Sequence, residues 1–153
     1  MSKRSAVHDT FTLERTYPAA RERVFKAFAD PAAKARWFTP PEGWNVKRAG
    51  MEFKVGGKES VTSTPPGGQP HVFDAIYLDI VANERIVYVY EMHIGAAKIS
   101  ASLATIQFAA AGSGTKLTIT EQGVFLDGYD DAGSRKQGTQ YLMEQVGRSL
   151  ETN

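Results

Sequence analysis

The chain contains no cysteine. Disulfide bonds, thiolate nucleophiles and cysteine-bound metals are therefore excluded. No run of five like charges occurs, and 18 lysines and arginines against 17 aspartates and glutamates leave a formal charge of +1. Nucleic acids and anionic membrane surfaces bind concentrated basic patches, so this even balance argues against both as partners.

Long apolar runs are also missing. No stretch approaches the length of a membrane span, and no apolar segment follows the basic N-terminus as it would in a signal peptide. We therefore expect a cytoplasmic protein without membrane insertion.

Residues that could hold a cofactor are few. The three histidines His8, His71 and His93 lack metal-site spacing, and a protein metal site needs three or four convergent ligands. Neither a glycine-rich phosphate loop nor a Gly-x-Ser-x-Gly motif is present. We expect no metal, no other cofactor and no serine nucleophile, and we assign no catalytic residue.

The composition that remains is that of a globular protein. The chain has 153 residues, of which 42% are hydrophobic and 23% charged. This length suits one domain with one sizeable core. Because repeats, low-complexity tracts and linkers are absent, we expect a single domain over residues 8–151, preceded by a flexible N-terminus at residues 1–7.

The hydrophobic period changes twice along the chain. Helical spacing over residues 20–29 and 32–38 predicts two short helices, and residues 130–151 regain that spacing in one long amphipathic helix. Between them the period is two, which predicts strands. The predicted strands are residues 8–17, one beginning at residue 44, 51–64 with a kink at Gly56 and Gly57, 72–81, 86–92, 98–109 and 115–125.

Hairpin-rich strands imply antiparallel neighbours, so the pattern predicts an α+β fold built on a curved antiparallel sheet. A sheet with one apolar face needs a cover, and the helix at residues 130–151 is the element long enough to provide it. A space between a bent sheet and its covering helix is the best candidate for a functional site.

Several segments, in order, resemble a known family. They are residues 11–20 (FTLERTYPAA), 24–31 (VFKAFADP) with Trp37 and Phe38, 41–43 (PEG), 53–57 (FKVGG), 80–86 (IVANERI), 114–118 (GTKLT) and 121–125 (EQGVF). The chain resembles the homologues of the activator of heat-shock-protein-90 ATPase, in the START-like (SRPBCC) superfamily.

The resemblance implies a helix-grip fold, in which a curved antiparallel sheet wraps around a long C-terminal helix. It also implies an apolar cavity between them, as in lipid-transfer START domains and the birch-pollen allergen. The matching motifs are structural and carry no catalytic residue, and members of the superfamily have different functions.

Alternation selects the side chains that would face such a cavity. It places Tyr88, Tyr90 and Met92 on one strand face and Glu121 with Phe125 on another. Several tyrosines on one face favour a partly wet cavity, because a buried tyrosine needs a partner for its hydroxyl, although plain core packing explains any single one equally well. The candidate ligand-binding residues are Trp37, Phe53, Phe73, Tyr77, Tyr88, Tyr90, Met92, Glu121, Phe125, Tyr141 and Gln145.

Glu121 is the most informative candidate, because the register that buries Leu117 and Ile119 also turns its carboxylate inward. A buried carboxylate must be paired, hydrogen-bonded or protonated. The favoured interpretation is a structural salt bridge or hydrogen bond to the last helix, for example to Gln137 or Gln145. The functional alternative is a ligand acceptor or a general base.

Three functional hypotheses follow. The leading one is non-enzymatic binding of a small hydrophobic or amphipathic molecule that is lipid-, flavonoid- or polyketide-like. The second is a cyclase or aldolase-like enzyme on a polyketide-type substrate, with Glu121 as its acid or base. The third is a module that stimulates a chaperone ATPase, which the family resemblance suggests. A homodimer is left open.

Overall fold

The computed structural model describes residues 4–151, which form seven strands and three helices. In chain order these are β1 Ala6–Tyr17, α1 Arg21–Ala29, α2 Pro31–Ala35, β2 Asn45–Met51, β3 Lys58–Thr64, β4 His71–Val81, β5 Arg85–Ile94, β6 Ala97–Ala111, β7 Gly114–Leu126 and α3 Ala132–Glu151. The predicted α+β order of two short helices, a run of strands and one long helix is confirmed.

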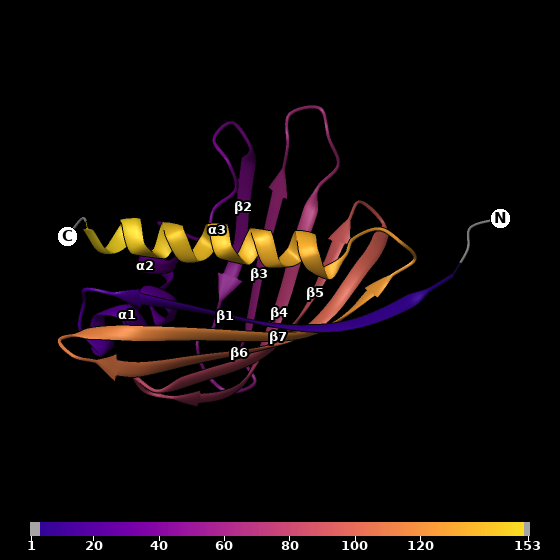
Figure 1. The fold of residues 1–153 in the computed structure, drawn as a ribbon. Coiled ribbons are helices and arrows are strands. Elements are labelled where there is room, and N and C mark those ends of the chain that lie inside the picture. The colour runs from indigo at the N-terminus through magenta and orange to yellow at the C-terminus, as the bar shows by residue number, and fades with distance from the viewer. Residues whose placement is uncertain (1–3, 152–153) are drawn as a thin grey trace.

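All neighbouring strands are antiparallel, and their order across the sheet is β1-β7-β6-β5-β4-β3-β2. Consecutive strands from β2 to β7 are neighbours, and β1 joins the outer edge of β7. The sheet turns strongly along this order, because β2, β3 and β4 cross the view of Figure 1 steeply while β1, β6 and β7 run along α3. Right-handed strand twist accumulates in this way and makes one face concave.

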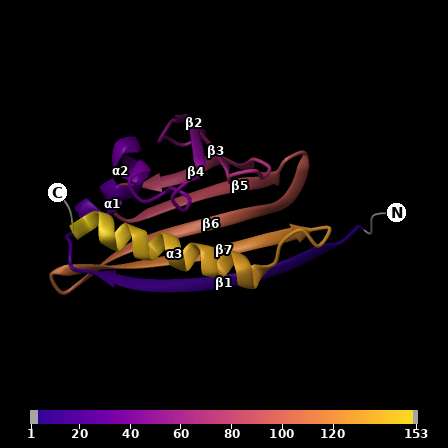
Figure 2. The same cartoon turned by 90° about the horizontal axis from the view of Figure 1, so that it is seen from above.

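Helix α3 lies against the concave face, over the side formed by β1 and β7 (Figure 2). Its buried residues Thr139, Met143, Val146 and Leu150 recur every three or four positions, so they form one stripe. The Tyr17 hydroxyl donates to the Met143 carbonyl oxygen at 2.6 Å. Gly147 permits the close approach, since a Cβ there would lie only 3.2 Å from the Tyr17 ring. These contacts hold the C-terminal half of α3 to the sheet.

Helices α1 and α2 close one end of this concave face. The Asp30 carboxylate accepts the Ala33 N–H at 2.9 Å and caps α2, and Pro31 occupies the first turn, where its missing N–H costs nothing. Phe28 of α1 packs on Trp37 at a ring distance of 4.7 Å and on Phe108 of β6 at 5.5 Å. The apolar core is therefore continuous from the short helices to the sheet.

The prediction of one kinked strand over residues 51–64 is wrong in its first half, because residues 52–57 form a loop between β2 and β3, and it is confirmed for Lys58–Thr64. A kinked strand would pass through Gly56, but Gly56 has a φ of +83°, and a Cβ at Gly57 would lie 2.0 Å from the Glu52 carbonyl oxygen. The loop instead bonds to β4, where Gly56 N–H donates to the Tyr77 carbonyl at 2.7 Å and Tyr77 N–H to that of Gly57 at 3.0 Å.

The first strand also begins earlier than predicted. Ala6 pairs with Leu126 and Val7 with Phe125, so β1 starts two residues before the expected domain boundary at residue 8. The pairing with β7 continues N-terminally past the alternating apolar residues from which the strand was predicted. Residues 1–3 of the predicted flexible N-terminus lie outside the described residues. Among residues 4–151, none of the helices has the length and apolar character needed to span a membrane.

Candidate functional site

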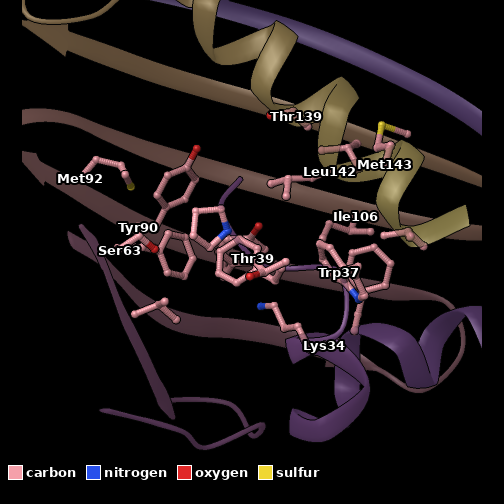
Figure 3. Close-up of a pocket in the computed structure, with 18 of the residues that line it drawn as sticks. Lys34, Trp37, Thr39, Ser63, Tyr90, Met92, Ile106, Thr139, Leu142 and Met143 are labelled. Carbon is pink, nitrogen blue, oxygen red and sulfur yellow. The ribbon is translucent and has the colours of Figure 1, made fainter. Parts of the chain in front are cut away.

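A pocket of about 270 Å³ lies between α3, the short helices and the concave face of the sheet (Figure 3). This volume is near the lower end of the roughly 300–1,000 Å³ typical of small-molecule sites. Most of its wall is apolar or aromatic, and polar side chains interrupt it at a few points. The lining residues are Phe28, Lys34, Trp37, Phe38, Thr39, Pro40, Trp44, Val61, Ser63, His71, Phe73, Tyr88, Tyr90, Met92, Ile106, Ile119, Glu121, Thr139, Leu142, Met143 and Val146.

The pocket has a deep side and an open side. Trp37, Ile106 and Val146 on the deep side are buried, and the Trp37 indole N–H donates to the Ala27 carbonyl at 2.7 Å. The open side carries partly exposed residues: Thr39, Pro40, Trp44, Ser63, His71 and Met92. The Trp44 and His71 rings meet edge to face at 5.2 Å on that side.

Glu121 of β7 is the centre of one polar cluster in the wall. The Tyr90 hydroxyl donates a short hydrogen bond to its carboxylate, and Thr139 Oγ1 of α3 lies 3.0 Å from the other oxygen. Burial raises the pKa of Glu121, while the hydrogen bond from Tyr90, the charge of Arg135 and the hydrogen bond from Thr139 oppose that rise. Among residues 4–151 no cation pairs directly with this carboxylate.

Arg135 supports this cluster from the first turn of α3. Its guanidinium donates to the Tyr90 hydroxyl at 3.0 Å, to Ser100 Oγ at 2.8 Å and to the Asp130 carboxylate at 3.0 Å. It also lies 5.3 Å from the ring centre of Phe125, within cation–π range. Tyr90 therefore connects Arg135 to Glu121 and fixes the N-terminal half of α3 over the sheet.

Lys34 of α2 and Glu59 of β3 form a second buried cluster. Their charged atoms lie 2.6 Å apart, their side chains are 7% and 4% exposed, and the Tyr77 hydroxyl donates to the same carboxylate oxygen at 2.5 Å. Figure 3 shows the Lys34 amine directed into the ring of pocket side chains. Burial lowers the pKa of Lys34, and the Glu59 carboxylate opposes that shift.

Tyr88 lies in the aromatic wall between these two clusters. Its ring packs on Tyr77 at 6.0 Å and on Tyr90 at 5.8 Å. Its hydroxyl has no hydrogen-bond partner within residues 4–151, yet it is not one of the polar atoms sealed from solvent. The Tyr88 hydroxyl is therefore open to the pocket, where it can donate to a bound molecule or accept from it.

The structure brings together six of the predicted binding residues. Trp37, Phe73, Tyr88, Tyr90, Met92 and Glu121 all line the pocket. Alternation along β5 correctly predicted that Tyr88, Tyr90 and Met92 share one face, and alternation along β7 correctly predicted that Glu121 faces inward. The favoured interpretation of Glu121, a structural hydrogen bond to the last helix, is confirmed by Thr139 of α3, but the partners named as examples, Gln137 and Gln145, are wrong. Gln137 instead lies on the exposed face of α3.

The other five predicted residues lie outside the pocket wall: Phe53, Tyr77, Phe125, Tyr141 and Gln145. Phe53 and Tyr77 pack on each other at 5.1 Å beneath it, and Phe125 lies against Arg135. Tyr141 is 45% exposed. From α3, Leu142, Met143 and Val146 line the pocket in place of Tyr141 and Gln145.

Sequence reasoning missed Lys34, Glu59 and Thr139. The pattern held a signal for two of them, because Glu59 precedes the buried Val61 by two residues on a strand. Lys34 precedes Trp37 and Phe38 by three and four residues, which is one face of a helix. Charged residues are almost never fully buried unless paired, so a charge at an inward position is easily dismissed.

The side chains present suit the binding of a small molecule better than the binding of a metal ion. Within residues 4–151 no group of three or more histidine, aspartate or glutamate side chains could hold a metal ion. The pocket instead offers an acceptor at Glu121, a donor at Lys34 and a hydroxyl at Tyr88, separated by aromatic surface. This arrangement suits a small molecule with polar groups at separated positions on an apolar body.

Comparison with known proteins places the chain among bacterial relatives. A protein of Rhizobium leguminosarum described as uncharacterised is 44% identical over 99% of both chains, with a TM-score of 0.93. The Mll3558 protein of Rhizobium loti is 44% identical over 95% of this chain and 99% of its own, with a TM-score of 0.87. A protein of Chromobacterium violaceum is 31% identical over 94% and 98%, with a TM-score of 0.80.

None of the curated proteins matches the chain. The model of one family, described as activator of Hsp90 ATPase homolog 1-like protein, matches residues 18–151. That match covers all three helices and strands β2 to β7, in agreement with the helix-grip architecture. The chain therefore belongs to the family of activator of Hsp90 ATPase homolog 1-like proteins.

Proposed function

We propose that this protein binds one small amphipathic molecule in the pocket between α3 and the sheet. The observation that carries the proposal is the Tyr88 hydroxyl, which has no hydrogen-bond partner among residues 4–151 and lies in a wall that is otherwise mostly aromatic and apolar. Core packing alone does not explain such an atom, because a polar atom without a hydrogen-bond partner does not stabilise a packed core. Apolar contact would supply most of the affinity, and Tyr88, Lys34 and Glu121 would orient the ligand.

A catalytic role for Glu121 has one observation in its favour, because burial raises the pKa of this carboxyl toward the range of a general base. Its geometry favours binding. Both carboxylate oxygens already contact hydroxyl groups, those of Tyr90 and Thr139. A general base must take up the substrate proton, and this carboxylate already accepts from two hydroxyl groups, so we assign Glu121 to holding Tyr90 in place and, through its remaining lone pairs, to accepting a hydrogen bond from the ligand.

The test is a ligand screen read out on methyl groups of the pocket. Lipids, flavonoid-like aromatics and polyketides are added to protein with labelled methyls, and chemical shifts are recorded. Binding in the pocket shifts Met92, Ile106, Ile119, Leu142 and Val146, whereas the exposed Val7, Val55 and Leu78 report nonspecific effects. Absence of shifts in the pocket group with every class would contradict the proposal.

A matched pair of variants shows whether a hit occupies the pocket. Ser63 lies on the open side of the wall, and its neighbour Thr62 points to the opposite face of β3. Ser63→Phe should narrow the opening and weaken binding at least tenfold. Thr62→Phe adds the same ring outside and should leave the affinity unchanged. Equal effects of the two substitutions would place the ligand elsewhere.

The family description also suggests a chaperone ATPase as partner. This alternative predicts a protein complex that forms without a small ligand. A pull-down of the purified chain with the chaperone at moderate salt, repeated with Ser63→Phe, separates the two ideas. Capture that Ser63→Phe leaves unchanged, together with a silent ligand screen, would favour the partner-binding function.

A further inference from the structure

The Lys34 amine occupies an unusual position, because it is buried and yet borders open volume. The residue is 6% exposed and lines the pocket. Its single hydrogen bond goes to Glu59, so two of its three N–H donors have no partner among residues 4–151. The side chain therefore presents a nitrogen to whatever enters the pocket.

Aromatic rings make up much of the remaining surroundings of this nitrogen. Nζ lies 4.7 Å from the ring centre of Phe38, 5.9 Å from that of Tyr88 and 6.0 Å from that of Phe73. Ring faces attract a cation, and they offer neither a proton acceptor nor bulk water. The nitrogen thus has one acidic neighbour, Glu59, and an apolar approach from the pocket side.

The charged and titratable groups around Lys34 come from four elements. Glu59 of β3 is in direct contact, and Tyr77 of β4 shares its carboxylate. Tyr88 of β5 faces the amine across its ring, and Arg48 of β2 acts on it through its positive charge. Burial is the main influence and lowers the pKa of Lys34. A larger share of this amine is therefore uncharged, and nucleophilic, than for a lysine in water.

We propose that Lys34 captures an aldehyde or ketone group of the ligand as a Schiff base. The inference rests on the proposed function, since the pocket must first admit a small molecule. It adds a chemical class to that ligand, namely a carbonyl compound with an apolar or aromatic body. It also gives Lys34 a covalent role that packing alone does not require.

The reaction balances within the groups present. Glu59 accepts a proton from the Lys34 ammonium, and the free amine attacks the carbonyl carbon, forming a C–N bond as the C=O π electrons move to oxygen. That oxygen takes the proton back from Glu59 and a second proton from nitrogen, and it leaves as water. The product is an iminium ion beside the Glu59 carboxylate. No oxidant, reductant or co-reactant is needed.

The surroundings suit this product as well as they suit the free lysine. The positive charge stays on the same nitrogen, so the ion pair with Glu59 and the contact with the Phe38 ring survive the reaction. The Tyr88 hydroxyl, open to the same space, can donate to the carbonyl oxygen as negative charge develops there.

Two surface lysines provide matched controls inside the same molecule. Lys98 lies 2.5 Å from Glu91, and Lys116 lies 2.7 Å from Glu14, so each has a carboxylate neighbour as Lys34 does. Their side chains are 48% and 47% exposed. Any excess reactivity of Lys34 over these two therefore reports burial and the pocket, because the ion pair is common to all three.

The experiment treats the full chain with naphthaldehyde and cyanoborohydride near neutral pH, which reduces an imine to a stable amine, and maps the modified lysines by mass spectrometry. We expect Lys34 to be modified at least tenfold faster than Lys98 and Lys116. Lys34→Arg keeps the positive charge and should lose this fast modification. The mapping on the wild-type chain decides the question even if that variant fails to fold.

A parallel titration with the corresponding naphthyl alcohol separates this inference from the proposed function. The alcohol cannot form an imine, and its binding is read from the pocket methyl shifts. If the alcohol shifts the pocket methyls but the aldehyde does not modify Lys34 preferentially, the Schiff-base proposal is overturned and the binding proposal stands. If neither occurs, the capture is overturned, and the wider ligand screen decides the proposed function separately.

Discussion

The two buried carboxylates of this protein are stabilised in different ways. Glu59 forms an ion pair with Lys34 at 2.6 Å, whereas within residues 4–151 the polar partners of Glu121 are the hydroxyl groups of Tyr90 and Thr139. Each also accepts from a tyrosine, Tyr77 in one cluster and Tyr90 in the other. The Glu59 cluster therefore depends on charge pairing, and the Glu121 cluster on hydrogen bonding to α3.

The difference matters for function because the clusters meet the pocket differently. In the first cluster Lys34 lines the pocket and Glu59 lies behind Lys34, so the pocket meets a cation there. At the other cluster Glu121 itself lines the pocket, and Arg135 lies behind Tyr90. A ligand held between them would place an acceptor near Lys34 and a donor near Glu121.

Breaking the ion pair should have the largest effect on stability. Lys34→Met leaves the Glu59 carboxylate buried without a cation, which typically costs about 3–5 kcal/mol. The measurement is the free energy of unfolding from urea denaturation. A loss under about 1 kcal/mol would mean that water or another group reaches Glu59, which would contradict the buried pair described here.

Two further variants test the origin of that loss. Lys98→Met removes a surface cation paired with Glu91, and it should cost less than about 1 kcal/mol. Lys34→Met combined with Glu59→Leu removes both charges, and it should recover most of the loss, because replacing a buried pair by apolar groups is often nearly neutral.

The two tyrosine hydroxyls sharpen the comparison. Tyr90→Phe removes the short hydrogen bond to Glu121 and a partner of Arg135, with an expected cost of about 1.5–3 kcal/mol. Tyr77→Phe should cost less, about 1 kcal/mol, because Glu59 keeps Lys34. Urea denaturation of the two variants under one condition gives the order. The reverse order would show that the ion pair with Lys34 does not make Glu59 less dependent on its tyrosine hydrogen bond.

Glu121→Gln should change the free energy of unfolding little at acidic pH, and its effect should depend on pH. Burial raises the pKa of Glu121 above its ordinary value of 4.5, so the folded state holds the proton more tightly than the unfolded state. The stability that Glu121 contributes is full below that value and is lost as pH rises through the folded pKa. The variant should therefore gain stability relative to wild type as pH rises above about 4.5.

The amide can satisfy the same site. Its oxygen can accept from Tyr90 and its nitrogen can donate to Thr139 Oγ1, whose own hydrogen can go to the Arg135 carbonyl at 3.1 Å. Urea denaturation of both proteins at several values between about pH 4 and pH 8 checks the trend. A difference that stayed constant, or fell with pH, would mean that Glu121 is ionised in the folded state at little cost.

The architecture could be predicted because its signals are local and repeated. A period of two over most of the chain and a final amphipathic segment specify a sheet with one covering helix. The same alternation gave the inward register of Tyr88, Tyr90 and Glu121. The loop at residues 52–57 was missed because its backbone is set by a distant contact with Tyr77 of β4, which no local pattern reports.

The pairing of buried charges was harder to foresee. Lys34 and Glu59 lie 25 positions apart in the sequence, and each alone reads as an exposed charge. Their partnership depends on how α2 docks over β3, which is a matter of tertiary packing. Which residues of α3 reach the pocket was hard to foresee for a similar reason, since the contacts of Gly147 and of the Met143 carbonyl with Tyr17 set how the helix lies on the sheet.

The smallest expected change in stability belongs to Tyr88, whose hydroxyl lies between the two clusters and bonds to neither. Tyr88→Phe should alter the free energy of unfolding by less than about 0.5 kcal/mol, because it removes no hydrogen bond of the described residues 4–151 and keeps the ring contacts with Tyr77 and Tyr90. The affinity for a ligand with a polar group should nevertheless fall about fivefold to tenfold, the equivalent of about 1–1.4 kcal/mol for one lost hydrogen bond. Calorimetric titration alongside urea denaturation separates the two quantities, and Tyr90→Phe is the control whose stability should fall. A stable variant with unchanged affinity would show that this hydroxyl faces water in the bound state, and it would remove the observation on which the binding proposal rests.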